Sequence, residues 1–327
     1  MKIGILGCGA YGLALSNILK KDNNILMWTK FSEEKENLEK NRSNDKVLPG
    51  YKLDDSIKVT TDLEYCIKDS DLLIIVIPIL FLEETVISMK PYINNHNILI
   101  ATKGITSDGL LAHDVIENNL NTKNVGVLSG PTFAIDLVSN NIAGFTIASK
   151  SKSIDNIVDK VFIQDNLKIE YISDLVGTEI CGSIKNVLAI SAGILSGLRS
   201  NESGQAMVLT EMINEIKYII EKLGSDSNTI LSFAGIGDIL LTCTSTKSRN
   251  FSLGKLIGEG KSKEEIKKYL ENTTVEGVYT LKAMKKLLDN NSIKSDDVDV
   301  IYNVVFNNRN PKDLLTYYVN KSKEEIC

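Results

Sequence analysis

The sequence predicts an α/β fold in which a doubly wound, mostly parallel sheet is followed by an all-α domain. Up to about residue 173, short β-branched runs alternate with helical patterns, which is typical of parallel strands joined by helical crossovers. After residue 198 the strand patterns stop and only helical patterns are present. A chain of 327 residues is long enough for two domains. We therefore predict one domain at residues 1–173 and a second at residues 174–327.

The predicted strands of the first domain are short apolar runs that end at polar or turn residues. They are Lys2–Leu6, Ile25–Trp28, Leu72–Ile77, Ile98–Ala101, Val125–Leu128, Gly144–Ala148 and Leu167–Ile172. Helical patterns lie between them at Leu13–Leu19, Phe81–Met89, Leu111–Asn119, Phe133–Ser139 and Ile154–Phe162. Ligands of such sheets bind beyond the carboxyl ends of the strands. Three polar groups follow strands there, at Pro78, Thr102-Lys103-Gly104 and Ser129-Gly130-Pro131-Thr132. Each is either part of a ligand site or only a turn, since Gly and Pro are common in turns.

A glycine-rich turn links the first predicted strand to the first helical pattern. Its sequence is Gly7-Cys-Gly9-Ala-Tyr-Gly12, a G-x-G-x-x-G motif between a strand and a helix. Gly7 permits the tight turn, Gly9 lets a pyrophosphate approach the backbone, and Gly12 lets helix and sheet pack closely. The free N–H groups at the start of the helix then bind phosphates. The first domain is therefore predicted to be a Rossmann-type dinucleotide-binding domain.

The second domain begins with a helix predicted over Asp174–Leu198, with Asp174 as a plausible N-cap. At about 100° per residue, one stripe of this helix carries Lys185 with Asn186 on its flank. The alternative is a lysine that extends from a surface helix into solvent. We favour Lys185 as the reacting base, because the other residues of its stripe are small and leave room around the amine. They are Thr178, Cys181, Gly182, Ala189, Ala192 and Ser196.

Further helical patterns lie at Gln205–Leu223, Glu264–Leu270, Tyr279–Leu288, Val298–Phe306 and Lys312–Tyr318. Between them, the stretch from Phe233 to Asn250 combines small residues, an acid, hydroxyls and a cation without clear helical periodicity. Its last three residues, Ser248-Arg249-Asn250, precede another helical pattern. Helix N–H groups and a guanidinium converging there would suit a phosphate. The alternative is a capped helix with an exposed arginine.

Composition narrows the classes of partner. The net charge of −5 gives no reason to expect nucleic acid or an anionic membrane. No apolar run reaches the roughly 18–20 residues that span a bilayer. The five cysteines are scattered and only two histidines are present, so we expect no disulfide framework and no metal site. These features predict a cytoplasmic, reduced protein.

Seven stretches together identify a resemblance. The chain resembles the bacterial NAD(P)-dependent glycerol-3-phosphate dehydrogenases over nearly its whole length. The stretches occur in that family's order and are Gly7–Gly12, Ala101–Gly104, Leu128–Ala134, Lys185–Ile190, Gly235–Thr244, Ser248–Asn250 and Val275–Gly277. A different member of the wider 6-phosphogluconate and hydroxyacid dehydrogenase superfamily would share the architecture, but would lack the Gly235–Thr244 and Ser248–Asn250 pair. A catalytically silent dinucleotide-binding protein would be expected to lose Lys185 or Asp238, and both are present.

The resemblance implies a cytosolic dimer that interconverts dihydroxyacetone phosphate and glycerol 3-phosphate for phospholipid synthesis. Lys185 would be the proton acceptor, oriented by Asp238 and Thr242 and flanked by Asn186. Contacts to the substrate would come from Lys103, Gly130, Thr132, Lys185, Asp238, Ser248, Arg249 and Asn250. Contacts to the dinucleotide would come from Gly7, Gly9, Ala10, Tyr11, Gly12, Lys30, Lys103, Ala134, Arg249, Thr274 and Glu276. The chain departs from the family pattern at two places: Ile79-Leu80 replaces the usual Ser-Gln, and Glu211 replaces a common Arg.

The choice between NAD and NADP depends on the residues at the end of the second strand. NAD-selective sites place an acid there to bind the ribose 2′-hydroxyl. Here Trp28 is succeeded by Thr29-Lys30-Phe31-Ser32, while Glu33 and Glu34 come later and are assigned to the next helix. Without an acid at the expected position, and with Lys30 as a possible partner of a 2′-phosphate, the sequence predicts that both cofactors are used and that NADPH is equal to or moderately better than NADH.

Overall fold

The chain folds as two units, and the computed structural model describes residues 1–245 and 248–324. Unit 1 comprises Met1–Lys103 and Leu111–Leu175, and unit 2 comprises Gly104–Leu110 and the chain from Val176 onward. The predicted division was a single boundary after residue 173. The structure differs from it, because Gly104–Leu110 belongs to unit 2. Within unit 2, the side-chain amide of Asn290 donates to the carbonyl of Asp108 at 2.7 Å, which ties this segment to the helical part of the chain. The end of the predicted second domain, residues 325–327, lies outside the described residues.

Unit 1 is built on one sheet of eight strands in the order β3-β2-β1-β4-β5-β6-β7-β8. Neighbouring strands are parallel except that β7 runs antiparallel to β6, so the predicted mostly parallel sheet is confirmed. Strand β3 was not predicted from the sequence, because it has only three residues. The strands are β1 Lys2–Leu6, β2 Asn24–Trp28, β3 Lys58–Thr60, β4 Leu72–Ile75, β5 Asn97–Ile100, β6 Val125–Ser129, β7 Ala143–Ser149 and β8 Leu167–Ile172.

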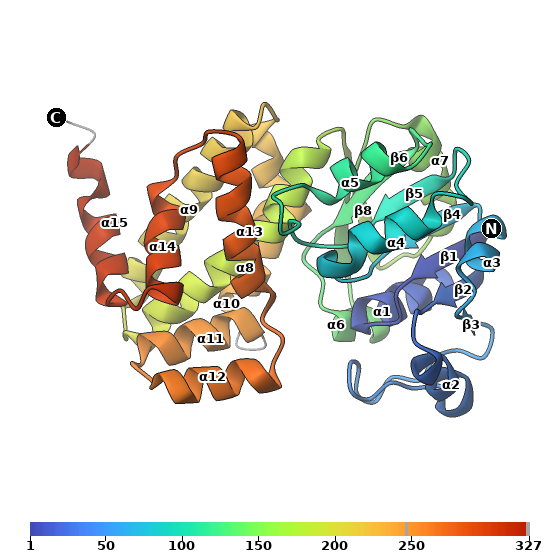
Figure 1. Ribbon diagram of the computed structural model, residues 1–327, viewed down its shortest axis with the longest axis horizontal. Helices are drawn as coiled ribbons and strands as arrows, with labels where there is room; N and C mark the ends of the chain where they lie inside the picture. The colour runs from blue at the N-terminus through green and yellow to red at the C-terminus, as the bar shows by residue number, and fades with distance from the viewer. Residues whose placement is uncertain (246–247, 325–327) are drawn as a thin grey trace. The chain divides into compact units, whose positions relative to one another are not determined.

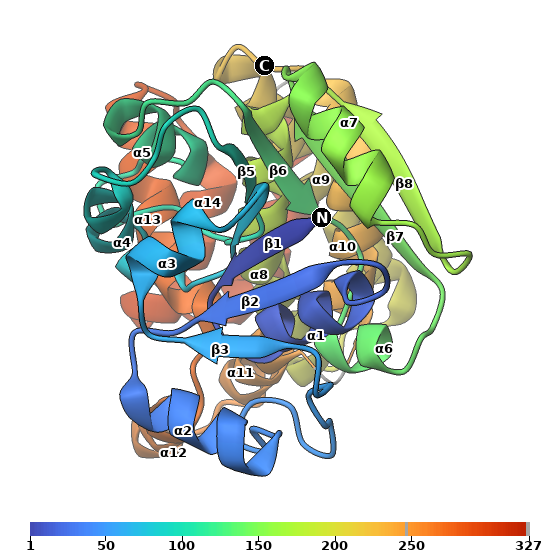
Figure 2. The same cartoon turned by 90° about the vertical axis from the view of Figure 1, so that its right-hand side faces the viewer.

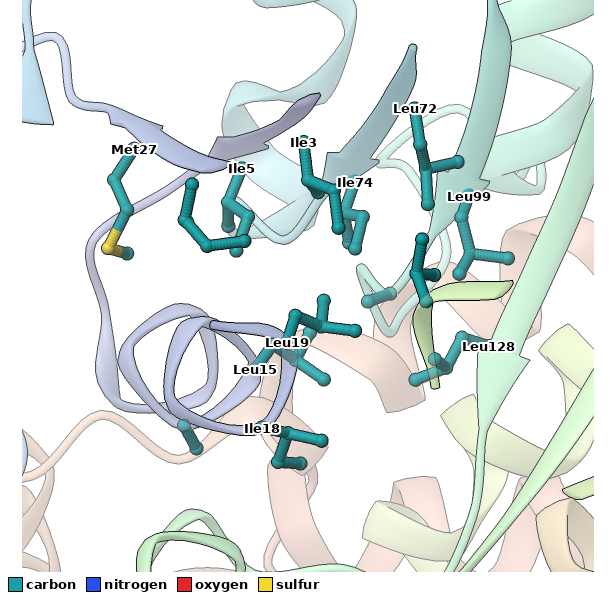
Figure 3. Close-up of a cluster of buried hydrophobic side chains, with 14 of the residues drawn as sticks. Ile3, Ile5, Leu15, Ile18, Leu19, Met27, Leu72, Ile74, Leu99 and Leu128 are labelled. Carbon is teal, nitrogen blue, oxygen red and sulfur yellow. The ribbon is translucent and has the colours of Figure 1, made fainter. Parts of the chain in front are cut away.

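Helices cover both faces of this sheet, as expected for a doubly wound fold (Figure 2). One apolar cluster joins α1 and α7 to one face, and it contains Ile3 and Ile74 (Figure 3). A second cluster joins α3, α4 and α5 to the other face, and it contains Leu6 and Ile75. The helices of unit 1 are α1 Ala10–Leu19, α2 Ser32–Asn41, α3 Leu63–Lys68, the 3₁₀ turn η1 Ile79–Phe81, α4 Leu82–Met89, α5 Ala112–Asn119, α6 Ala134–Val138 and α7 Lys152–Val161.

Unit 2 contains helices and no strand among its described residues, so the predicted all-α second part is confirmed (Figure 1). Its longest helix, α8, spans Leu175–Gly197, close to the predicted Asp174–Leu198. The other elements are α9 Glu202–Lys222, η2 Ser227–Leu231, the π-helical turn η3 Phe233–Gly237, α10 Asp238–Thr244, α11 Arg249–Gly258, α12 Lys263–Asn272, α13 Glu276–Asn290, α14 Asp296–Phe306 and α15 Lys312–Glu324.

Helix α8 is also long and apolar enough to cross a membrane, by length and composition alone. It contains a window of 18 residues with a mean hydropathy of 1.4, which the sequence analysis did not recognise because polar residues such as Lys185 interrupt it. Within the protein, 83% of that window is buried. A buried core helix passes the same test of length and composition, and this is the position that α8 occupies.

Helices α8 and α11 touch through their backbones. A Cβ built on Gly254 of α11 would lie 1.9 Å from the carbonyl oxygen of Ile190, and a Cβ on Gly258 would lie 2.1 Å from that of Ile194. In the other direction, a Cβ on Gly193 of α8 would lie 2.1 Å from the carbonyl oxygen of Phe251. Each helix thus places glycines four residues apart on the contact face, and no larger residue fits there. This contact fixes the position of α11 against α8.

We expect Gly254→Ala to destabilise the protein by about 1–3 kcal/mol or more, because a methyl group cannot enter the α8–α11 contact without moving backbone. Denaturant unfolding followed by far-ultraviolet circular dichroism measures this change. Gly204→Ala in α9 is the control, since its added methyl would meet only the side-chain atoms of Ser200 and Asn201. Wild-type stability in Gly254→Ala would contradict the close helix contact.

Candidate active site and dinucleotide turn

The centre of unit 2 holds a buried ion pair between Lys185 of α8 and Asp238 at the start of α10. The Lys185 Nζ lies 2.6 Å from both Oδ1 and Oδ2 of Asp238. Lys185 is 8% exposed and Asp238 is 1% exposed. The alternative in which Lys185 extends from a surface helix is therefore wrong. Instead, the structure brings together the predicted base and the predicted acid, which are 53 positions apart in sequence.

The turn before α10 delivers Asp238 to this position. Gly235 within η3 has φ −86° and ψ −109°, which breaks the helical path just before α10 begins. A Cβ on Gly235 would lie 2.1 Å from the carbonyl oxygen of Ile230, so this turn requires glycine. Thr242, one turn further along α10, donates from Oγ1 to the carbonyl of Asp238 at 2.7 Å and lies 3.4 Å from its Oδ1. Thr242 thus packs against the carboxylate that holds Lys185.

Cys243 lies near the same pair and was not singled out by the sequence analysis. Burial raises the pKa of its thiol to about 12, while the charge of Lys185 lowers this pKa and the charge of Asp238 raises it. The thiol is therefore protonated at neutral pH and contributes a small apolar side chain to the wall of the ion pair.

A ring of amide hydrogen bonds joins three segments next to Lys185. Asn250 donates from Nδ2 to the Oδ1 of Asn186 at 3.0 Å, and its own Oδ1 accepts from the backbone N–H of Gly277 at 2.8 Å. Asn186 donates from Nδ2 to the Oε2 of Glu276 at 3.3 Å. The structure thereby brings the predicted residues Asn186, Asn250 and Glu276 together. Thr274 is exposed on the segment that leads into α13.

The N-terminus of α11 carries the predicted phosphate anchor. Ser248 is the N-cap, and its hydroxyl accepts from the N–H of Phe251 at 3.3 Å. Arg249 begins the helix and is exposed, and its carbonyl accepts from the hydroxyl of Tyr269 at 3.1 Å. This geometry fits the alternative interpretation, a capped helix with an exposed arginine. It equally fits a phosphate anchor, because the exposed guanidinium can reach a ligand. Thr246 and Lys247, which precede it, lie outside the described residues.

The glycine turn of unit 1 has the geometry that a dinucleotide requires. Gly7 has φ +126°, which favours glycine, and its N–H donates to the carbonyl of Trp28 at 2.9 Å. A Cβ on Gly12 would lie 2.1 Å from the carbonyl oxygen of Gly7, so α1 can approach the turn only with glycine there. A Cβ on Gly9 would project into open space, and Gly9 caps α1 without a side-chain hydrogen bond. The start of this helix therefore has open space beside Gly9, which suits the approach of a pyrophosphate to its N–H groups.

The other predicted contacts of unit 1 gather at the ends of neighbouring strands. The hydroxyls of Tyr11 and Thr132 lie 2.9 Å apart, and the Lys103 Nζ lies 5.9 Å from the centre of the Tyr11 ring. Gly130, just after β6, has φ +155°, and a Cβ there would lie 2.4 Å from the carbonyl oxygen of Gly144. Ala10 and Ala134, at the starts of α1 and α6, are half-buried against the first apolar cluster.

The residues after β2 differ from the sequence expectation. Lys30 is exposed and pairs with the Oε1 of Glu84, which lies 2.7 Å from its Nζ. Glu34 lies in the first turn of α2, but its carboxylate returns to the strand end and accepts a hydrogen bond from the hydroxyl of Thr29. The expectation that Glu33 and Glu34 belong to the next helix is confirmed, but the side chain of Glu34 still brings a carboxylate to the end of the second strand. The sequence could not show this, because the acid comes from the next helix.

The arrangement of donor groups gives no metal site among the residues that the structure describes. No group of three or more His, Cys, Asp and Glu side chains is close enough there to hold an ion. The four described cysteines, Cys8, Cys66, Cys181 and Cys243, are all buried as free thiols.

Comparisons with known proteins match both parts of the chain. The models for the N-terminus and the C-terminus of NAD-dependent glycerol-3-phosphate dehydrogenase match residues 2–155 and 174–316. Glycerol-3-phosphate dehydrogenase [NAD(P)+] of Staphylococcus epidermidis is 33% identical over 311 residues, which cover 93% of each chain. The same enzyme of Teredinibacter turnerae is 33% identical over 321 residues, 97% of this chain and 94% of the relative.

Solved structures agree with these matches. The crystal structure of glycerol-3-phosphate dehydrogenase from Coxiella burnetii has a TM-score of 0.90 and 27% identity, and the match covers 97% of this chain and 98% of that one. A ketopantoate reductase from Ralstonia eutropha has a TM-score of 0.60 and 14% identity over 97% of this chain and 99% of its own, and this likeness shows the fold alone.

The buried pair generates a prediction about stability. We expect Asp238→Leu to destabilise the protein by about 3–5 kcal/mol, because it leaves the charged amine of Lys185 buried without its partner. Adding Lys185→Met to that variant is expected to recover part of the lost stability, since the double variant removes both charges of the pair. Denaturant unfolding of the two single variants and the double variant measures the coupling. Strictly additive losses would show that the two groups do not interact.

Proposed function

The chain belongs to the NAD-dependent glycerol-3-phosphate dehydrogenase family, and we propose that it interconverts dihydroxyacetone phosphate and sn-glycerol 3-phosphate. The observation that carries this proposal is the buried Lys185–Asp238 pair, with Nζ 2.6 Å from both carboxylate oxygens. In the same unit, Arg249 opens α11 as an exposed cation. The glycine turn of unit 1 suits a dinucleotide. An acid–base group, a phosphate anchor and a cofactor turn are the parts that the reaction needs.

The chemistry assigns one task to each part. A nicotinamide cofactor, when bound, would supply or accept the hydride at the substrate's C2 carbon. When the ketone is reduced, its oxygen must gain a proton, and Lys185 holds that proton on Nζ. A carboxylate bonded through both oxygens favours the charged form of an amine, so the resting pair is prepared for ketone reduction. In the reverse direction Lys185 accepts the hydroxyl proton, and Asp238 then keeps the amine in position.

The phosphate of the substrate would bind at the start of α11. A guanidinium forms paired, charge-assisted hydrogen bonds with phosphate, and the N-terminal end of a helix adds a favourable dipole. The first turn of α11 contains no acidic residue that would oppose an anion. The roles of Lys103, Gly130 and Thr132 toward substrate, and of Ala10, Tyr11, Ala134, Thr274 and Glu276 toward the dinucleotide, stay predictions from the family resemblance.

The cellular setting also belongs to this proposal. The protein would act as a cytoplasmic homodimer, without a metal ion, and supply glycerol phosphate for phospholipid synthesis. Placing α8 in the protein core and not in a bilayer is supported by the burial of 83% of its apolar window. The second candidate function, a silent dinucleotide-binding protein, is disfavoured by the intact Lys185–Asp238 pair.

The purified protein is expected to oxidise NADH or NADPH when dihydroxyacetone phosphate is added, and Lys185→Ala is expected to slow this reaction by ~10²–10⁴-fold. Absorbance of the reduced nicotinamide measures the rate, and a nucleotide-binding titration serves as the control, because the lysine variant should still bind the cofactor. Folded wild-type protein that shows no turnover at saturating substrate would contradict the proposed activity. Near wild-type turnover in Lys185→Ala would instead place the base elsewhere.

Arg249→Ala is expected to weaken the reaction of dihydroxyacetone phosphate far more than that of unphosphorylated dihydroxyacetone. A charge-assisted hydrogen bond to phosphate contributes ~1.5–3 kcal/mol, which the unphosphorylated substrate never gains. The ratio of kcat/KM for the two substrates, measured in wild type and variant, tests this. Equal losses for both substrates would assign Arg249 to the cofactor or to the fold.

A further inference from the structure

The end of β2 lies against the glycine turn of unit 1. The carbonyl of Trp28 accepts hydrogen bonds from the N–H of Gly7 at 2.9 Å and from the thiol of Cys8 at 3.7 Å. In Rossmann-type sites the adenosine ribose binds at the end of the second strand, next to this turn. The groups around Thr29 therefore determine which ribose is accepted, one with a 2′-hydroxyl or one with a 2′-phosphate.

A carboxylate is fixed at this position by contacts on both of its oxygens. The hydroxyl of Thr29, which is 3% exposed, donates to the Oε2 of Glu34. The amide of Asn44 donates to its Oε1 at 3.3 Å. The charge of Glu34 also reaches the glycine turn, since the pKa of the Cys8 thiol is raised by burial first and by Glu34 second. Glu34 thus supplies a negative charge at the junction of β2 and the turn.

The cation next to this position is already paired. Lys30 Nζ lies 2.7 Å from the Oε1 of Glu84, and the two side chains are 59% and 65% exposed. An exposed pair of this kind is weak, so a phosphate can attract Lys30. Binding of Lys30 to the phosphate would separate Lys30 from Glu84. The phosphate would then face two carboxylates, those of Glu34 and Glu84. The single favourable charge is therefore outnumbered.

We propose that Glu34, assisted by Glu84, is a specificity-determining residue that makes this enzyme prefer NADH to NADPH. A carboxylate accepts a hydrogen bond from a ribose 2′-hydroxyl and repels a 2′-phosphate. This preference differs from the sequence prediction of dual use with NADPH equal or moderately better, which assigned Glu33 and Glu34 to the next helix and counted only Lys30 at the strand end. The inference rests on the proposed function, because it concerns the cofactor of that same reaction.

Direct binding of NADH and NADPH to the intact protein, without substrate, tests the proposal through nucleotide fluorescence. Wild type is expected to bind NADH at least about fivefold more tightly than NADPH. Glu34→Gln is expected to strengthen NADPH binding by about five- to tenfold, and Glu84→Gln by about twofold. Glu33→Gln is the matched control, since it removes the same charge from the adjacent, exposed position of α2 and should leave the ratio unchanged.

The possible outcomes separate this inference from the activity itself. Equal or tighter binding of NADPH by wild type would overturn the inference, and so would an equal effect of Glu33→Gln and Glu34→Gln. If Glu34→Gln unfolds, Glu34→Asp keeps the charge but withdraws it from Thr29, and it should also reduce the preference. A clear NADH preference without reduction of dihydroxyacetone phosphate would refute only the proposed function. Protein that binds neither nucleotide would refute both.

Discussion

The buried contact between Lys185 and Asp238 constrains the rest of unit 2. Two opposite charges that are 8% and 1% exposed stabilise a fold only when their geometry is exact enough to offset the loss of water. Both partners are accordingly held by backbone features that allow no larger residue: Asp238 by the turn at Gly235, and the helix of Lys185 by its glycine contact with α11. A shift of either element would leave a charge buried without its partner.

The same constraint joins the Lys185–Asp238 pair to the N-terminus of α11, the proposed phosphate anchor. Gly254 and Gly258 place α11 directly on the backbone of α8, so the N-terminus of α11 has a fixed position relative to Lys185. Asn250, the second residue of α11, is bonded to Asn186, the neighbour of Lys185, at 3.0 Å. The proposed base and the proposed anchor are therefore parts of one packed assembly, which would suit the positioning of a small substrate for proton transfer.

The sequence predicted the features that repeat or that carry a distinctive local pattern. Strand–helix alternation predicted the sheet, and the stripe of small residues drew attention to Lys185, which the structure buries against Asp238. Other features escaped because they depend on contacts between distant segments. The antiparallel direction of β7 has no signature in a short apolar run, and the return of Glu34 to Thr29 depends on how α2 starts. The glycines spaced by four in α8 and α11 were visible in the sequence, but only the crossing of the two helices gives them a meaning.

The two charged regions of the protein respond differently to substitution and to salt. Glu34 and Glu84 lie near solvent, where charges separated by more than the Debye length of ~8 Å at physiological salt are largely screened. The effect that we propose for them on the choice of cofactor is therefore expected to be graded. Lys185 and Asp238 are shielded from solvent and from salt, so their interaction is strong. Replacing either residue alone is therefore expected to lower the free energy of unfolding strongly. The proposed cofactor preference can thus be changed by substitution without altering the buried Lys185–Asp238 pair.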